Sequence, residues 1–191
     1  MKRRWQESFG FIPRGICFIN TSLWLTFLFK FGTLHAMPKI SAGLLMYRCR
    51  EGELEFLLAH PGGPYFKNKD AGAWTIPKGE TKPDEDPLAA AKREFEEELG
   101  FPPQGSFVEL TPVQQKGGKV VQAWAFAGDC DPTQVRSNTF TMEWPPRSGK
   151  QEEFPEIDRA AVFNLSAAKE KINAAQAALL DEALQKILGK P

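Results

Sequence analysis

Three glutamates stand close together in a segment whose pattern predicts an amphipathic helix. Glu94 lies three residues before Glu97 and four residues before Glu98. Side chains three or four residues apart are neighbours on a helix surface. Like charges at i,i+4 cost about 0.2–0.5 kcal/mol per pair, and the C-terminal turns of a helix favour cations instead. An ordinary solvated face would avoid this arrangement. Three carboxylates without a nearby histidine suit a hard divalent ion, Mg²⁺ or Mn²⁺.

The helix that carries these glutamates has clear start and stop signals. Asp86 is a natural N-cap residue and Pro87 fits the first helical position. Gly100 suits the left-handed position that follows a helix. The pattern therefore predicts a helix over residues 87–99. We expect the glutamates to lie off its core-facing side, which consists of Leu88, Ala91, Phe95 and Leu99.

Apolar runs bounded by turn residues predict strands on both sides of this helix. The predicted strands are residues 41–47, 54–60, 74–77, 108–112, 119–128, 139–142 and 160–165. We expect residues 145–158 to form a charged loop, and Ser166 to cap a final amphipathic helix that runs through residue 188. Strands around one central and one terminal helix indicate a mixed α/β or α+β class.

The charge distribution excludes a general nucleic-acid coat. The 191 residues carry 24 basic and 24 acidic side chains, but residues 37–191 alone hold 19 basic against 23 acidic ones. An acidic body lacks the basic face that displaces counterions from phosphates. The three cysteines, Cys17, Cys49 and Cys130, are too few and too scattered for a disulfide framework or a zinc site. We therefore expect reduced thiols and a cytoplasmic protein.

The first 36 residues differ from the rest of the chain. They carry five basic residues against one acidic residue, and their longest uncharged stretch, residues 15–29, has 15 residues. A bilayer span needs about 20, so no membrane span is expected. Three interpretations stay open: translated sequence upstream of a natural start at Met37, a membrane-surface anchor, or a secretory signal. The folded domain is expected to comprise residues 37–191.

Residues 79–101, GETKPDEDPLAAAKREFEEELGF, resemble the Nudix box. The seven fixed positions of that motif are all filled, by Gly79, Glu85, Arg93, Glu94, Glu97, Glu98 and Gly100. At average composition, agreement by chance at seven positions is negligible. The strand–loop–helix order of residues 37–191 also resembles the Nudix fold, which is an α/β/α sandwich around a mixed β-sheet. The resemblance is specific for the family and not for the substrate.

The resemblance implies a metal-dependent pyrophosphohydrolase of the MutT-like type, which cleaves a nucleoside diphosphate linked to a further group X. Glu94, Glu97 and Glu98 would bind Mg²⁺ or Mn²⁺, together with the backbone carbonyl of Lys78. Arg93 would orient Glu94, and Glu85 would support the loop electrostatically, so the implied catalytic residues are Glu85, Arg93, Glu97 and Glu98. The proton acceptor stays open between a box glutamate and a carboxylate of the later loop: Glu152, Glu153 or Glu156.

Several residues near the box are candidates for substrate binding. Lys67, Lys78 and Gly79 are candidates for contact with the substrate phosphates, although loop lysines often serve solubility alone. Tyr65 and Trp74 would stack on a base, although aromatic residues at strand ends more often pack in a core. His60 ends a predicted strand beside a glycine-rich turn, and we interpret it as a structural histidine.

The substrate class follows from weaker signals. The tyrosine that marks diadenosine-polyphosphate enzymes past the box is absent, yet residues 74–79, WTIPKG, resemble the lead-in of those enzymes and of RNA-cap-trimming ones. We rank a nucleoside triphosphate or a dinucleoside polyphosphate first. The alternatives are 5′-triphosphorylated RNA, a non-catalytic nucleotide-binding regulator, and isomerase chemistry on an isoprenoid diphosphate. The oligomeric state stays open.

Overall fold

A six-stranded mixed β-sheet forms the centre of the described part of the chain, residues 40–189, in this computed structural model. The order of the strands is β4-β5-β1-β2-β8, with β3 paired to β1. Their bounds are β1 Ile40–Arg50, β2 Glu53–Pro61, β3 Lys78–Glu80, β4 Phe107–Gln114, β5 Val120–Ala127 and β8 Ile157–Asn164. The β1–β5 pair is parallel, and the other pairs are antiparallel. The leader, residues 1–36, and the expected domain start at Met37 lie outside the described residues.

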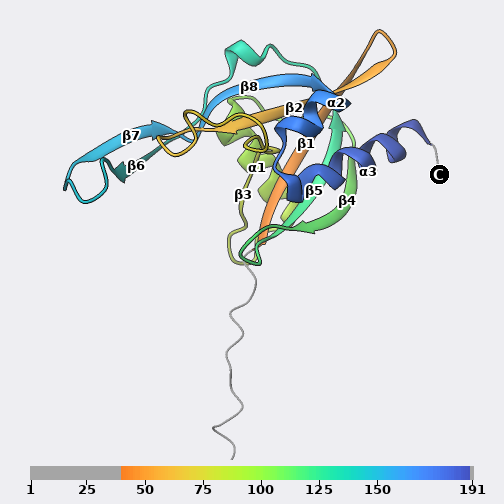
Figure 1. Cartoon of the computed structure of the whole chain (residues 1–191). Helices are drawn as coiled ribbons and strands as arrows, with labels where there is room; N and C mark the ends of the chain where they lie inside the picture. Colours follow the sequence, from red (N-terminus) through yellow and green to blue (C-terminus); the bar gives the residue numbers. More distant parts are fainter. Residues whose placement is uncertain (1–39, 190–191) are drawn as a thin grey trace, which may run out of the picture. The chain divides into compact units, whose positions relative to one another are not determined.

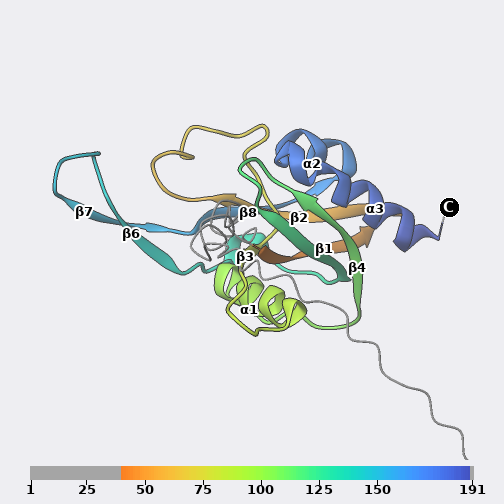
Figure 2. The same cartoon turned by 90° about the horizontal axis from the view of Figure 1, so that it is seen from below.

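Helices cover both faces of the sheet (Figures 1 and 2). Figure 2 shows α1 (Pro87–Leu99) on one face, and α2 (Leu165–Lys171) and α3 (Ala177–Leu188) on the other. One buried cluster lies between the sheet and α1, and a second lies between the sheet and the two later helices. The predicted mixed α+β class with an α/β/α sandwich is therefore confirmed.

Strand β1 is buried on both faces because it lies in the middle of these layers. Its residues alternate between the two clusters: Leu44 and Met46 pack towards α1, and Leu45 packs towards α2 and α3. Both faces of such a strand must be apolar, which explains the continuous apolar run of the sequence. These side chains are buried, so β1 contributes to the apolar cluster on each face of the sheet.

One edge of β1 pairs with β2 along one part and with β3 along another, and the pairing with β3 positions the Nudix-like box. Residues 47–50 pair with β2, whereas residues 41–43 pair with β3. The predicted strand over residues 74–77 is wrong in position. Trp74 and Thr75 make only isolated bridges to other segments, and the ladder begins at Lys78. The box glycine is therefore held against β1 at the centre of the molecule.

The predicted bounds of α1 are confirmed, and its caps explain them. The Asp86 side chain accepts a hydrogen bond from Ala89 N at 2.9 Å. Gly100 has a φ of 84°, and its N–H donates to Glu96 O at 2.8 Å. Local sequence signals thus fix both ends of the helix that carries the glutamates.

The expected loop over residues 145–158 is wrong, because much of it is strand. Strands β6 (Thr139–Glu143) and β7 (Gln151–Pro155) form a separate two-stranded sheet, which we call the arm. Trp144 N donates to Lys150 O at 2.9 Å and closes the turn. Figure 1 shows the arm extending from the end of the main sheet where β2 ends and β8 begins.

The single terminal helix predicted over residues 166–188 is broken into α2, a 3-10 turn (Ala174–Gln176) and α3. The break occurs because the backbone at residues 171–173 pairs with Trp74 instead of continuing the helix. Trp74 N donates to Lys171 O at 3.0 Å, and Asn173 N donates to Trp74 O at 2.7 Å. The start is also different, since the cap of α2 is Asn164 rather than Ser166. No helix among residues 40–189 is long and apolar enough to span a membrane.

Candidate active site

Arg93 is the centre of the ionic network on α1. Its Nε and Nη2 donate to the two carboxylate oxygens of Glu85 at 2.9 and 3.0 Å, a forked pair. Its Nη1 donates to Glu94 Oε1 at 2.6 Å and to Glu97 Oε2 at 3.1 Å. Arg93 and the Lys82 N–H lower the pKa of Glu85 to about 2. One guanidinium thus fixes the loop before the helix and two of the three glutamates on it.

Glu98 differs from the other two glutamates because it is buried, with 8% of its surface exposed. The helical pattern placed it off the core face, but β3 covers it: Lys78 N donates to Glu98 Oε2 at 3.0 Å. Burial raises the pKa of Glu98 to about 8; the ammonium and N–H of Lys78 oppose this shift, and the negative charges of Glu94 and Glu156 add to it. A buried carboxylate among like charges is costly without a cation.

The glycine of the box is required by close packing against Glu94. A Cβ atom at Gly79 would lie 1.8 Å from Glu94 Oε2, so only glycine leaves room for this carboxylate beside β3. Desolvation lowers the pKa of the neighbouring Lys78 ammonium, while Glu98 and Glu94 oppose that shift. The Lys78 ammonium therefore acts on Glu98 and Glu94, and the Lys78 backbone N–H also acts on Glu98.

Glu156 is the loop carboxylate that the fold brings to the glutamates of α1. Its backbone belongs to a chain of hydrogen bonds: Asn138 N donates to Glu97 O at 3.1 Å, Glu156 N to Asn138 O at 2.8 Å, and Gly62 N to Glu156 O at 2.8 Å. Loss of water around its carboxylate raises the pKa of Glu156, and the charges of Glu94 and Glu97 raise it further. We call Glu94, Glu97, Glu98 and Glu156 the carboxylate cluster.

The donor set of this cluster fits a hard divalent cation. Within residues 40–189, no three His, Cys, Asp or Glu side chains are spaced to hold a metal ion as they stand. Arg93 holds an oxygen of Glu94 and of Glu97. The oxygen-only chemistry is nevertheless that of Mg²⁺ and Mn²⁺ sites. A cation beside Glu98 would offset the loss of solvation of this buried carboxylate and its repulsion by Glu94 and Glu156.

The other sequence-predicted residues divide into two groups. Tyr65 and Lys67 lie in the loop after β2 and are exposed, next to the arm. Trp74 is not available for stacking on a base: it is 4% exposed, and its ring packs edge-on against His60 and Phe163. The expectation that Trp74 binds substrate is therefore wrong, and its alternative role in the core is correct.

His60 holds the loop after β2 against β8. The side chain is fully buried; Nδ1 lies 2.7 Å from Asp158 Oδ1 and Nε2 lies 2.8 Å from Lys69 O. Its role as a structural histidine is confirmed by these contacts. A backbone carbonyl can only accept, so Nε2–H of His60 donates to Lys69 O.

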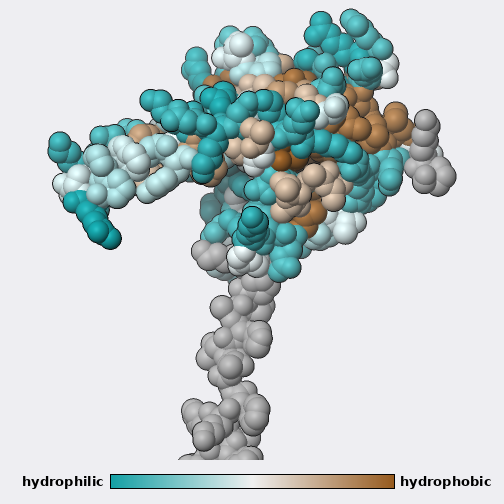
Figure 3. All heavy atoms as spheres, viewed as in Figure 1, coloured by the Kyte–Doolittle hydropathy of each residue, from teal (hydrophilic) through white to brown (hydrophobic). Residues whose placement is uncertain are grey.

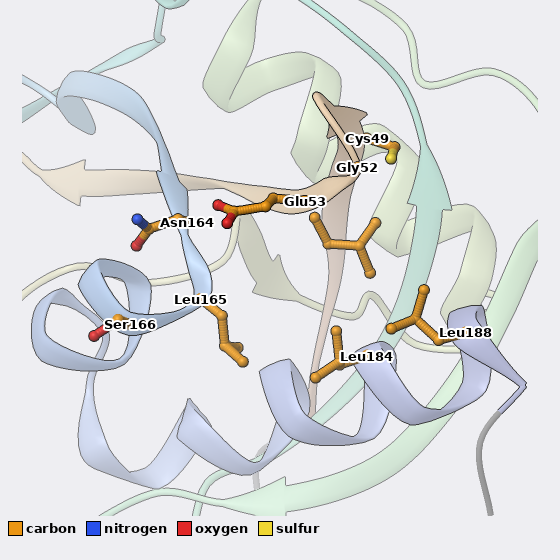
Figure 4. Close-up of a pocket in the computed structure, with 9 residues that line it drawn as sticks. Cys49, Gly52, Glu53, Asn164, Leu165, Ser166, Leu184 and Leu188 are labelled. Carbon is orange, nitrogen blue, oxygen red and sulfur yellow. The ribbon is translucent and has the colours of Figure 1, made fainter.

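Several hollows of the described residues lie outside the carboxylate cluster, and two of them are relevant here. The arm cleft, about 580 Å³, lies between the arm and the loop after β2, and the residues that line it are Gly63, Pro64, Lys67, Asn68, Trp144, Glu152, Phe154, Pro155 and Asp158. A second pocket of about 390 Å³ lies at the other end of the sheet (Figure 4).

The second pocket is largely apolar. Figure 4 shows Leu165, Leu184 and Leu188 around it, with Cys49 and Glu53 from the ends of β1 and β2. Figure 3 shows hydrophobic side chains gathered on the same side of the molecule as the end of α3. The pocket begins at Cys49, seven residues along β1 from Ala42, which pairs with Gly79. Seven strand residues span about 23 Å, so this pocket does not belong to the carboxylate cluster.

The sequence did not reveal the arm cleft. Trp144 lies in the turn directly after β6, and Phe154 lies on β7, within the residues 145–158 that the sequence led us to expect as a loop. A usable signal was present, because the turn-forming residues 145–149, PPRSG, separate two short segments that each contain phenylalanine. Of the candidate bases, Glu152 lines this cleft, and Glu153 accepts a hydrogen bond from Thr139 Oγ1 within the arm.

Comparisons with solved structures agree with this fold. A C. elegans Ap4A hydrolase, in a binary complex, is 24% identical and matches with a TM-score of 0.58 over 78% of this chain and 98% of that one. The NUDIX domain of Shewanella oneidensis NrtR, complexed with ADP ribose, is 13% identical, with a TM-score of 0.55 over 78% and 88%. A mutT/nudix family protein from Listeria innocua is 17% identical, with a TM-score of 0.54 over 80% and 96%.

The sequence comparisons give the family. A search of curated proteins gave no match. The model of the NUDIX domain, however, matches residues 37–183, which is more than half of the chain and includes the whole box. The chain therefore belongs to the NUDIX domain family.

Proposed function

We propose that this protein is a divalent-metal-dependent hydrolase that cleaves a phosphoanhydride bond in a nucleoside diphosphate-X substrate. The observation that carries the proposal is Glu98, a buried carboxylate that faces the charges of Glu94 and Glu156. Burial of a carboxylate is costly, and the contacts of Glu98 with the N–H and the ammonium of Lys78 offset that cost only in part, because its pKa stays raised. A bound cation that also contacts the substrate polyphosphate would explain the burial of Glu98 near the charges of Glu94 and Glu156.

The carboxylates of Glu94, Glu97 and Glu98, with the carbonyl of Lys78, would hold Mg²⁺ or Mn²⁺. When bound, such an ion neutralises phosphate oxygens and acidifies water. Arg93 keeps Glu94 and Glu97 on one side of α1 through its Nη1 contacts. Gly79 leaves room for Glu94, and the Lys78 ammonium supplies a further positive charge for the phosphates.

We propose Glu156 as the proton acceptor for the attacking water. It is the one candidate of the later loop whose raised pKa reflects the charges of Glu94 and Glu97, and a base works best with a pKa near the operating pH. It is also exposed and on a different segment from α1, so its carboxylate is free to meet a water molecule. Water then attacks one phosphorus, the bond to the bridging oxygen breaks, and the proton moves to Glu156.

We rank a nucleoside triphosphate or a dinucleoside polyphosphate first among substrates. The name of the C. elegans Ap4A hydrolase, a fold neighbour, is consistent with the second. A 5′-triphosphorylated RNA end is the next candidate, because it presents the same bond. A binding-only regulator is less well supported, because all the box glutamates are present. We also propose a cytoplasmic location, as expected from the few, scattered cysteines of the sequence.

The test is product analysis after incubation of the full chain with a nucleotide panel. The panel holds nucleoside triphosphates, dinucleoside polyphosphates, ADP-sugars and 5′-triphosphorylated RNA, each with Mg²⁺ and with a chelator. We expect Mg²⁺-dependent cleavage of a phosphoanhydride bond in at least one class. No turnover by folded protein across the panel, with either Mg²⁺ or Mn²⁺, would contradict the proposal.

A further inference from the structure

We infer that the arm cleft binds the base and ribose of the nucleotide whose phosphate chain reaches the carboxylate cluster. The inference rests on the proposed function for its phosphate end, and it assigns to the arm the recognition of the nucleoside. The cleft volume, about 580 Å³, is within the range of about 300–1,000 Å³ that is usual for small-ligand sites.

The cleft and the carboxylate cluster are joined by a short piece of chain. Pro155 and Asp158 line the cleft, and Glu156 between them belongs to the cluster. The hydrogen bond from Gly62 N to Glu156 O, 2.8 Å, holds this piece against the start of the loop after β2. A ligand in the cleft therefore lies within a few residues of the proposed base.

The side chains of the cleft have the chemistry that recognises a nucleoside phosphate. Trp144 and Phe154 are half-buried aromatic residues that offer ring faces for base stacking. Lys67 is an exposed cation that suits a phosphate, and it lies across the cleft from the arm. The carboxylate of Glu152 accepts hydrogen bonds from amino or hydroxyl groups of the kind that bases and riboses carry.

Both walls of the cleft are held in place. On the loop side, His60 contacts Asp158 and the carbonyl of Lys69. On the arm side, Tyr65 of the loop packs edge-on against Trp144, with ring centroids 5.4 Å apart. A Cβ atom at Gly63 would lie 3.1 Å from the Phe140 ring. An isolated two-stranded hairpin has little stability of its own, so these contacts give the arm a defined position over the loop.

A purely structural role of Trp144 makes a different prediction from a role in binding. If its ring only fastened the arm to Tyr65, its loss would weaken all ligands equally through disorder of the arm. If it stacks on a base, its loss weakens only ligands that carry a base. A ligand pair that differs in the base alone separates the two roles.

The experiment measures binding by calorimetry to the full chain without metal. The ligands are the four common nucleoside 5′-monophosphates and ribose 5-phosphate, which have no phosphoanhydride bond to cleave. We expect at least one monophosphate to bind more tightly than ribose 5-phosphate, by about 5- to 150-fold, the range for stacking of one base. Trp144→Ala should remove this advantage and leave ribose 5-phosphate binding unchanged, whereas Trp144→Phe should retain most of it.

The lysine gives a second, independent variant. Lys67→Ala should weaken the monophosphate and ribose 5-phosphate alike, by about tenfold. Lys150→Ala is the matched control, because it removes the same charge from the exposed turn of the arm, and Lys150 does not line the cleft. We expect it to bind as wild type. If Trp144→Ala does not fold, the binding measured for Trp144→Phe and Lys67→Ala still tests the inference.

The outcomes separate this inference from the proposed function. Equal binding of monophosphates and ribose 5-phosphate, or full monophosphate affinity in folded Trp144→Ala, would overturn the inference even if the protein hydrolyses nucleotides. Base-dependent binding through Trp144 in a protein that cleaves nothing in the nucleotide panel would support the inference and contradict the proposed function.

Discussion

The carboxylate cluster and the arm cleft lie next to each other but are built in different ways. Three of the four cluster residues come from two turns of one helix, and their neighbours Arg93 and Gly79 belong to the same 23-residue motif. The cleft is assembled from residues 63–68 and 144–158, segments about 80 positions apart. Chemistry that needs closely spaced like groups is encoded locally here, whereas the proposed recognition of the nucleoside depends on tertiary contacts.

This difference implies that substitutions in the two regions should have different kinetic signatures. A cluster variant should lower kcat for every substrate, because it affects the reacting phosphate. A cleft variant should raise KM for nucleotides and leave kcat nearly unchanged.

Glu156→Gln should lower kcat by about 100-fold, within the range for loss of a general base. The fall of the rate at acidic pH should also disappear, because in the wild type it reports protonation of a carboxylate with a raised pKa. The measurement is the pH profile of kcat for the cleaved nucleotide. Glu153→Gln is the matched control, since that carboxylate is occupied by Thr139 within the arm. An unchanged profile in Glu156→Gln would place the base elsewhere.

Gly79→Ala should lower kcat by about 10- to 100-fold, because its Cβ atom would displace the Glu94 carboxylate from beside β3. The control is Gly117→Ala in the turn between β4 and β5. That position has a φ of 88° and no atom within 4 Å of an added Cβ, so it tests the general cost of losing a glycine. Equal activity of both variants would show that the close approach to Glu94 has no role in turnover.

Lys67→Ala should raise KM for the cleaved nucleotide by about tenfold, with kcat within about twofold of wild type. The cleft contacts substrate and transition state alike, so the loss is uniform binding energy. Steady-state kinetics on wild type, Lys67→Ala and Lys150→Ala give the comparison. A fall in kcat instead would mean that Lys67 acts on the reacting phosphate, and the two regions would no longer be functionally distinct.

Glu98→Gln should stabilise the metal-free protein, and more so at high pH. The folded-state pKa of Glu98 is about 8, above that of an unfolded glutamate, so the folded protein binds the extra proton between these values. Its stability therefore falls as pH rises from about 4.5 towards 8. The glutamine carries no charge, and its amide oxygen can still accept from Lys78 N. Thermal unfolding with chelator should show a larger rise in Tm at pH 8.5 than at pH 5.5.

A rise of equal size at both pH values would show that Glu98 is ionised throughout this range. Glu96→Gln, on the exposed side of the same helix, should leave Tm unchanged at both pH values and serves as the matched control.

The sequence predicted the locally encoded features well and those that depend on tertiary contacts poorly. The bounds of α1 were predictable because Asp86, Pro87 and Gly100 act within a few residues of chain. The glutamate cluster was predictable because helical spacing alone makes its members neighbours. The burial of Glu98 was not, since it depends on β3, which folds over the helix and donates from Lys78 N.

Other elements were hidden because distant segments override local preference. The terminal pattern is helical, yet Trp74 pairs with the backbone around Ile172 and breaks the helix. The turn residues 145–149 of the arm carry a local hairpin signal, but the position of the arm depends on the contact between Tyr65 and Trp144. Neither contact has a signal within a short window of sequence.

We propose that the carboxylate cluster performs metal-dependent hydrolysis. The most direct test is the rate of nucleotide cleavage against Mg²⁺ concentration for wild type, Glu98→Gln and Glu96→Gln. We predict rates that rise from background and saturate for wild type and Glu96→Gln. The Glu98→Gln rate should stay more than about 100-fold lower, since even the partners of metal ligands are worth about 10- to 100-fold. Full Mg²⁺-dependent activity in folded Glu98→Gln would contradict the account.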